Sequence, residues 1–181
     1  PDAIQSVEDM LVYLQDLVRR RRAASSDRDD PISAYLSLEI EGRRLGDEEI
    51  ASHLTLLLMG AVETFPKVFA SAALRLFQNP DQRTRVVHDL GRVPDAFWEA
   101  LRIDMPTQHL GRTAIKDVTV GGRTLRAGDP VLFLFASANR DEQEFENPDV
   151  FDVDRKARRI LGFGQGTHRC LGANVAAMEG K

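Results

Sequence analysis

The sequence predicts a mainly helical fold with a small β-sheet, and three observations lead to this class. Apolar residues recur at steps of three and four between Ile4 and Val18, as they do on one face of an amphipathic helix. A longer helix is predicted from about Glu48 to Phe77, where Asn79-Pro80 ends it. Strand-compatible residues gather between Val118 and Phe135, around a Gly121-Gly122 turn.

The first helix ends in an arginine run, Arg19 to Arg22, whose charges complement the negative end of a helix dipole. The run is compatible with a solvated helix end and with a nucleic-acid patch. A polar linker follows from Ala23 to Pro31, and a short helix is expected over Ile32 to Leu38.

The long helix is expected to begin with Asp47 as its N-cap and two acids in its first turn. Its segment from Leu54 to Met59 is apolar on every side, which predicts burial all round. Pro66 cannot donate a hydrogen bond to the carbonyl of Val62, so a kink is expected beside Glu63-Thr64. A functional distortion and a purely structural kink are both open at this point.

The second half of the chain alternates helix, strand and loop. Pro94 suits the first turn of a helix, and Gly121-Gly122 suits a hairpin turn. The expected order is a helix over Asp81–Leu90, a helix over Pro94–Leu101, strands over Val118–Val120, Arg123–Leu125 and Val131–Phe135, an irregular segment over Ala136–Ile160, and a last helix over Leu171–Met178.

Composition narrows the classes of function. The 181 residues carry 28 acids against 24 lysines and arginines, and this net charge of −4 argues against a general nucleic-acid binder. The single cysteine excludes an internal disulfide. The longest apolar run, Leu54 to Val62, is shorter than a membrane-spanning segment, and no signal peptide is visible. A cytoplasmic protein without a membrane segment is therefore expected.

The cysteine lies in a glycine-punctuated loop, Phe163-Gly-Gln-Gly-Thr-His-Arg-Cys-Leu-Gly172. Gly164 and Gly166 let the backbone bend and approach a flat ligand that a Cβ would push away. Because the residues after Leu171 are helix-compatible, Cys170 is expected near a helix N-terminus, where the thiolate that binds iron is favoured. Taken alone, a lone cysteine is also compatible with a buried structural thiol.

This loop resembles the haem-binding loop of the cytochrome P-450 family, Phe-Gly-x-Gly-x-His/Arg-x-Cys-x-Gly, at every fixed position. The resemblance implies haem b (iron protoporphyrin IX) as the cofactor and Cys170 as the metal ligand, a thiolate of the type that promotes O–O cleavage. It also implies that His168 contacts a haem propionate and that Phe163 packs beside the thiolate, with Gly164 in the same cofactor-binding loop.

Two further segments are similar to motifs of this family. Gly60-Ala61-Val62-Glu63-Thr64 resembles the oxygen-activating helix pattern, which implies that Glu63 and Thr64 are catalytic residues serving proton delivery to dioxygen. Ala61 departs from the glycine that is most common at its position. Gly111-Arg112-Thr113-Ala114 resembles a strand whose arginine, here Arg112, pairs with a haem propionate. On its own, an arginine on a strand is also compatible with a surface position.

Glu99-Ala100-Leu101-Arg102 resembles the family's Glu-x-x-Arg motif, and the segment that ends in Arg155 resembles the family's source of a second arginine. The resemblance implies a buried ion triad of Glu99, Arg102 and Arg155 that holds the scaffold of the haem loop. An arginine suits this role because its guanidinium stays charged and binds a carboxylate with two hydrogen bonds. Taken alone, the spacing of Glu99 and Arg102 is also compatible with a surface salt bridge.

Together these resemblances imply a haem-dependent monooxygenase of soluble bacterial type, which inserts one oxygen atom of O2 into a small organic substrate. Residues 1–181 are expected to form a partial cytochrome P-450 domain, its C-terminal half, without the N-terminal half and the final C-terminal strands. A peroxide-using haem-thiolate protein is disfavoured by Glu63-Thr64. A non-catalytic truncated remnant that binds haem weakly or not at all stays open.

The electrons of such a reaction come from a redox partner. Basic residues gather near the cysteine loop, at Arg155, Lys156, Arg158, Arg159 and Arg169. A basic surface would steer an acidic, ferredoxin-type partner, whereas a solvated charged loop accounts for the same residues. Arg155 is expected to turn inward, toward the triad.

Overall fold

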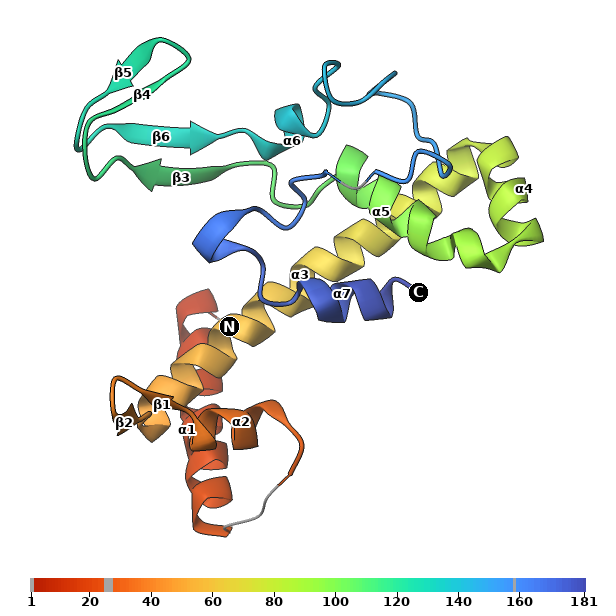
Figure 1. The fold of residues 1–181 in the computed structure, drawn as a ribbon. Helices are drawn as coiled ribbons and strands as arrows, with labels where there is room; N and C mark the ends of the chain where they lie inside the picture. The colour runs from red at the N-terminus through yellow and green to blue at the C-terminus, as the bar shows by residue number, and fades with distance from the viewer. Residues whose placement is uncertain (1, 25–27, 158) are drawn as a thin grey trace. The chain divides into compact units, whose positions relative to one another are not determined.

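The computed structural model describes residues 2–24, 28–157 and 159–181. They fall into two compact units, one up to Val62 and one from Glu63 onward. The long helix α3 (Asp47–Gln78) contributes its first part to one unit and its second part to the other (Figure 1). Most of the regular structure is helical and the sheets are small, which confirms the predicted fold class.

The first unit consists of helices and one hairpin. In chain order they are α1 (Ala3–Ala24), α2 (Pro31–Ser37), β1 (Glu39–Ile40), β2 (Arg43–Arg44) and the start of α3. Its core forms where the predicted apolar face of α1 meets α3, and Leu14, Val18, Ile50 and Leu54 are all buried there. The linker expected over residues 23–31 lies partly outside the described residues.

The hairpin of β1 and β2 has no counterpart among the predicted strands. Glu39 lies opposite Arg44, and the turn residues Glu41 and Gly42 have left-handed φ angles of 52° and 77°. Strands of two exposed residues leave no alternating apolar pattern, so periodicity could not predict them.

The start of α3 differs from its prediction at two points. Asp47 lies inside the helix, and the Glu49 carboxylate instead accepts the backbone N–H of Gly46 at 2.8 Å. The burial expected all round residues 54–59 is wrong, since Leu56 is 70% and Met59 53% exposed. Within this unit only one face of α3 packs against α1, so apolar composition on the other faces does not lead to burial there.

α3 continues as a helix through Pro66, and a change of its axis direction there stays a prediction. Among the described residues, α3 is the one helix long and apolar enough to cross a membrane by length and composition alone, a test that the core helix of a soluble protein also passes. The predicted absence of a membrane-spanning segment rested on the uninterrupted apolar run of residues 54–62, which is too short. α3 is long enough because a span may include a few charged residues.

The second unit contains the rest of α3 and the cysteine loop. In chain order its elements are α4 (Pro80–His88), η1 (Leu90–Arg92), α5 (Val93–Ile103), β3 (Leu110–Thr113), β4 (Val118–Val120), β5 (Arg123–Leu125), β6 (Pro130–Phe133), α6 (Phe135–Ala138), η2 (Gly166–His168) and α7 (Ala173–Glu179). These helices, and the hairpin of β4 and β5, confirm the predicted order.

The strands of this unit form two separate antiparallel ladders rather than one sheet. β3 pairs with β6, with Leu110 opposite Phe133. β4 pairs with β5 across Gly121 and Gly122, whose left-handed φ angles of 57° and 76° fit the predicted turn. Phe135 was expected to end a strand and begins α6 instead.

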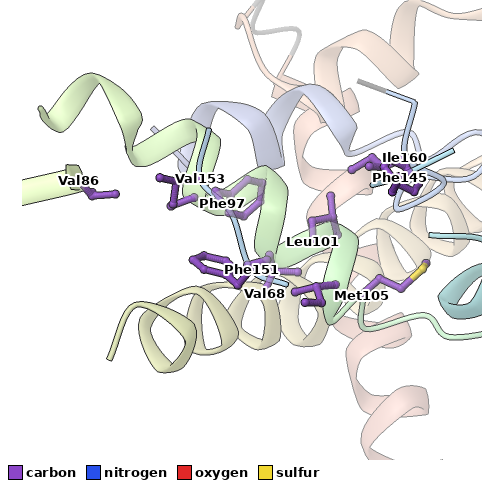
Figure 2. Packing of buried hydrophobic residues seen from close by; sticks show 12 residues of the cluster. Val68, Val86, Phe97, Leu101, Met105, Phe145, Phe151, Val153 and Ile160 are labelled. Atoms are coloured by element: carbon purple, nitrogen blue, oxygen red, sulfur yellow. The ribbon is translucent and has the colours of Figure 1, made fainter. Parts of the chain in front are cut away.

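Helix α5 lies at the centre of the core of the second unit (Figure 2). Phe97 and Leu101 of α5 belong to the same buried cluster as Val68 of α3 and Phe151 of the irregular segment after α6. Nearly every residue of α5 from Ala96 to Ile103 is buried. Polar side chains on this helix therefore need partners inside the protein.

Candidate cofactor site around Cys170

The cysteine loop, residues 162–172, is held in shape by its own backbone. The Cys170 amide donates to the carbonyl of Phe163 at 2.9 Å, and the Arg169 amide donates to that of Gly166 at 3.0 Å. Gly164 and Gly166 have left-handed φ angles of 64° and 77°, which side chains disfavour. The sequence signal of the two glycines therefore reflects a conformational requirement.

Cys170 is exposed and lies just before the N-terminus of α7, which confirms its predicted position. The alternative of a buried structural thiol is wrong in this structure. A Cβ built on Gly166 would meet no atom within 4 Å, and one on Gly164 only a carbonyl oxygen at 4.0 Å. An exposed thiol beside open glycine backbone is chemically and sterically suited to a flat, metal-centred ligand such as haem.

Two other glycines dock this segment onto α5. A Cβ on Gly162 would lie 2.7 Å from Cγ of Leu101, and one on Gly180 would lie 2.6 Å from the ring of Phe97. Both distances are shorter than real carbon contacts, so only glycine lets the backbone approach α5 at these points. The cysteine loop begins at the first of these close approaches, and α7 ends at the second.

The predicted ion triad is present and buried. Arg102 donates to both carboxylate oxygens of Glu99, and Arg155 Nε donates to Glu99 Oε1 at 3.0 Å. The side chains of Arg102, Glu99 and Arg155 are 0%, 2% and 12% exposed. This burial confirms the triad and the inward turn of Arg155, and it is inconsistent with a surface salt bridge.

Arg102 also binds the irregular segment that leads to the cysteine loop. Its guanidinium donates to the carbonyls of Asn139 and Pro148, both at 2.8 Å. The side chain of Asn139 is itself buried and accepts a hydrogen bond from the Leu161 amide at 2.7 Å. Asn139 carries no predicted role, although the segment Ser137-Ala138-Asn139-Arg140-Asp141 is similar to the family's sequence in this stretch.

The structure brings four of the predicted cofactor residues into one loop and leaves one apart. Phe163, Gly164, His168 and Cys170 all belong to residues 162–172. The ring of Phe163 packs edge-on against Trp98, with centroids 5.5 Å apart. Arg112 lies on β3, exposed, and donates to the neighbouring carbonyl of Gly111 at 2.8 Å. The contacts of His168 and Arg112 with a propionate stay predictions.

The predicted catalytic residues lie on α3. Glu63 is exposed and accepts a hydrogen bond from Lys67 Nζ at 2.5 Å. This hydrogen bond and the nearby ammonium charge lower the pKa of Glu63, so the carboxylate form is favoured. Thr64 is half-buried beside Phe65, which packs on the core of the second unit. Their roles in proton delivery stay predictions.

An exposed cysteine on a glycine loop and a buried ion triad are the two features that the resemblance to the cytochrome P-450 family implied. The comparison with protein families agrees, because the family model described as Cytochrome P450 matches residues 2–181. The chain belongs to the cytochrome P450 family.

Named relatives are bacterial oxygenases of this family. Steroid C26-monooxygenase of Mycolicibacterium smegmatis is 35% identical, over 98% of this chain and 45% of its own length. Cyclomarin C epoxidase CymV of Salinispora arenicola is 38% identical, over 95% of this chain and 43% of its own length. The crystal structure of CYP109E1 from Bacillus megaterium in complex with testosterone superposes with a TM-score of 0.91 at 33% identity, covering 98% of this chain and 49% of that one. The chain thus spans less than half the length of these relatives.

Proposed function

We propose that this chain is the haem-binding part of a monooxygenase that inserts one oxygen atom of O2 into a small organic substrate. The observation that carries the proposal is the exposed Cys170 thiol on a loop whose glycines leave its backbone open. When bound, the haem b group supplies the oxidation chemistry, and the protein supplies ligation, orientation and protons.

Each candidate site residue has a distinct role in this proposal. Cys170 provides the thiolate ligand, while His168, Arg112 and the loop at Phe163-Gly164 hold the edges and face of the cofactor. Thr64 presents a hydroxyl toward the reacting oxygen, and Glu63 supplies protons from the solvent side. Lys67 lowers the pKa of Glu63, so in this proposal Glu63 passes protons on through water as a carboxylate rather than holding one itself.

The partners and the compartment are part of the same proposal. We propose a cytoplasmic protein that receives electrons from a ferredoxin-type partner. Lys156, Arg159 and Arg169 are exposed and support this proposal, whereas Arg155 is bound to Glu99 and Arg158 lies outside the described residues. The relatives' names include a steroid monooxygenase and a cyclomarin C epoxidase, which support an apolar organic substrate without selecting one.

Reconstitution with haem tests the ligation. The reduced, CO-treated protein should give the Soret band of a thiolate adduct, and Cys170→Ala should abolish that band. Cys170→Ser, which keeps the size of the side chain, is the matched control for folding. A thiolate band that persists in Cys170→Ala would remove Cys170 from the site.

A non-catalytic remnant is the second candidate, since haem binding by these 181 residues is itself a prediction. Such a remnant would bind haem weakly or not at all. Titration of the 181-residue chain with haem separates the two, because tight, stoichiometric binding supports the oxygenase proposal and the absence of saturable binding supports the remnant.

A further inference from the structure

We propose that Asp104 is a positioning residue, which holds the face of α3 that carries Thr64 in register with the cysteine loop. The proposal rests on the function proposed for Thr64 and extends it to a residue outside the haem loop, the ion triad and the oxygen-helix motif. Asp104 is the C-cap of α5, the helix against which Gly162 and Gly180 dock the cysteine segment.

The Asp104 carboxylate accepts hydrogen bonds from two side chains of α3. Arg75 donates from Nε to Oδ2 at 2.7 Å and from its terminal nitrogen to Oδ1 at 2.6 Å. Ser71 Oγ donates to Oδ2 at 2.6 Å. A bidentate guanidinium pair fixes an angle as well as a distance, so this contact restrains how α3 is rotated.

The restrained face of α3 is the one that carries Thr64. Ser71 follows Thr64 by two turns of helix, and Arg75 follows Ser71 by one further turn. Val68, between them on this face, is 3% exposed and belongs to the core cluster. Pro66 lies between Thr64 and Ser71, but α3 continues as a helix through it, so a rotation at Ser71 is passed along about 10 Å of helix to the Thr64 hydroxyl.

On its other side Asp104 meets the segment that anchors the cysteine loop. Arg140 donates to the carbonyl of Ile103 at 2.8 Å, and its guanidinium lies 3.8 Å from Asp104 Oδ1. Its neighbour Asn139 binds the Leu161 amide at 2.7 Å, immediately before the loop begins at Gly162. One short segment thus connects the contact on α3 with the start of the cysteine loop.

The carboxylate form of Asp104 is maintained in this setting. Burial opposes its ionisation, but the hydrogen bonds from Arg75 and Ser71 and the charges of Arg75 and Arg140 outweigh burial and hold the pKa of Asp104 below its usual value. The contact therefore persists at neutral pH, where the enzyme would work.

The test uses the haem-loaded protein and the variants Asp104→Asn and Ser71→Ala. Both should bind haem as the parent does and yet divert several-fold more electrons to hydrogen peroxide. Thr64→Ala should show the same diversion at least as strongly. If Asp104 acts through Thr64, adding Asp104→Asn to Thr64→Ala should raise peroxide release no further, since effects on one shared group are not additive. Hydrogen exchange of the α3 amides near Thr64 should be faster in Asp104→Asn and in Ser71→Ala than in the parent, and this measurement does not depend on turnover.

Asp154→Asn is the matched control. Asp154 also accepts hydrogen bonds from two arginines, Arg85 and Arg92, but these bonds join α4 and η1, not α3, to the irregular segment. Ser71→Ala introduces a good helix former and should fold, so it tests the same contact even if Asp104→Asn fails to fold. If Thr64→Ala leaves coupling unchanged, the proposed function of Thr64 fails and this inference fails with it. If Thr64→Ala uncouples while Asp104→Asn and Ser71→Ala behave as Asp154→Asn does, only the role of Asp104 is refuted.

Discussion

Arg102 donates two parallel hydrogen bonds to the carboxylate of Glu99, at 2.9 and 2.8 Å, and both side chains are shielded from solvent. The other contacts of Arg102 reach the backbone of the irregular segment, at Asn139 and Pro148. One guanidinium thus neutralises the charge buried on α5 and satisfies carbonyl groups that no helix or strand can satisfy. The segment that carries the cysteine loop depends on this side chain for its path over α5.

Arg102→Ala should lower the free energy of unfolding by about 3–5 kcal/mol, because removal of one partner leaves an uncompensated buried charge. Chemical denaturation of the variant and its parent measures this loss. Arg126→Ala is the control, since Arg126 is 74% exposed and pairs with Asp117 on the surface, where ion pairs contribute little. Equal losses in the two variants would contradict the structural role of Arg102.

The extent to which the site could be predicted depends on how local its signal is. Cys170 lies within a few residues of the loop glycines, and Glu99 lies three residues before Arg102, so the sequence displays each group as a motif. The hydrogen bond from Ser71 to Asp104 spans 33 positions of sequence, and that from Leu161 to Asn139 spans 22. A local pattern carries no trace of such contacts.

The errors in the fold have a similar origin. The helical period located α3 correctly, but the apolar composition around Leu56 predicted burial that depends on neighbours far away in the chain. The strand residues at Val131 and Phe135 looked alike in sequence, yet only the first pairs with β3, and Phe135 turns into α6. Partners in tertiary structure decided both cases.

Gly162→Ala should destabilise the docking of the cysteine loop on α5 by about 1–3 kcal/mol, the usual cost of overpacking a core. The added Cβ would lie 2.7 Å from Cγ of Leu101. In a Leu101→Ala background the same change should cost less, because that background lacks the obstructing Cγ. Gly111→Ala is the matched control, since a Cβ there would meet nothing within 4 Å. Thermal unfolding compares these variants, and a Gly162→Ala protein as stable as Gly111→Ala would refute the close approach.

The acid dependence of the first unit should include a contribution from Glu49. A hydrogen bond from Arg43, followed by one from the Gly46 amide, lowers the pKa of Glu49 from 4.5 to about 2. A carboxyl whose pKa is lower in the folded state stabilises that state above the unfolded pKa, and this contribution is lost as pH falls. The loss should therefore run from about pH 4.5 down to about 2.

Titration of Glu49 by NMR measures this pKa directly. Arg43→Met should move it upward, toward 4.5, while Arg44→Met should leave it unchanged, because within the described part of the chain Glu49 forms its ion pair with Arg43. An unshifted Glu49 in the parent would contradict the hydrogen bonds at Arg43 and Gly46.

Charge reversal at Arg159 and Arg169 should slow the first electron transfer from an acidic ferredoxin. Arg169 adjoins Cys170 and is exposed, and the Arg159 side chain is 81% exposed beside Glu144. Positive charge near the thiolate raises the rate of encounter with an acidic partner, and salt screens that attraction within about 10 Å at 0.1 M. The variant Arg159→Glu/Arg169→Glu should therefore lose most of its rate at low ionic strength and approach the parent as salt is added. Stopped-flow reduction of the haem-loaded protein measures both effects. Arg123→Glu, which reverses an exposed charge on β5, should leave the rate unchanged. A rate that is insensitive to the double reversal and to salt would place the partner on another surface.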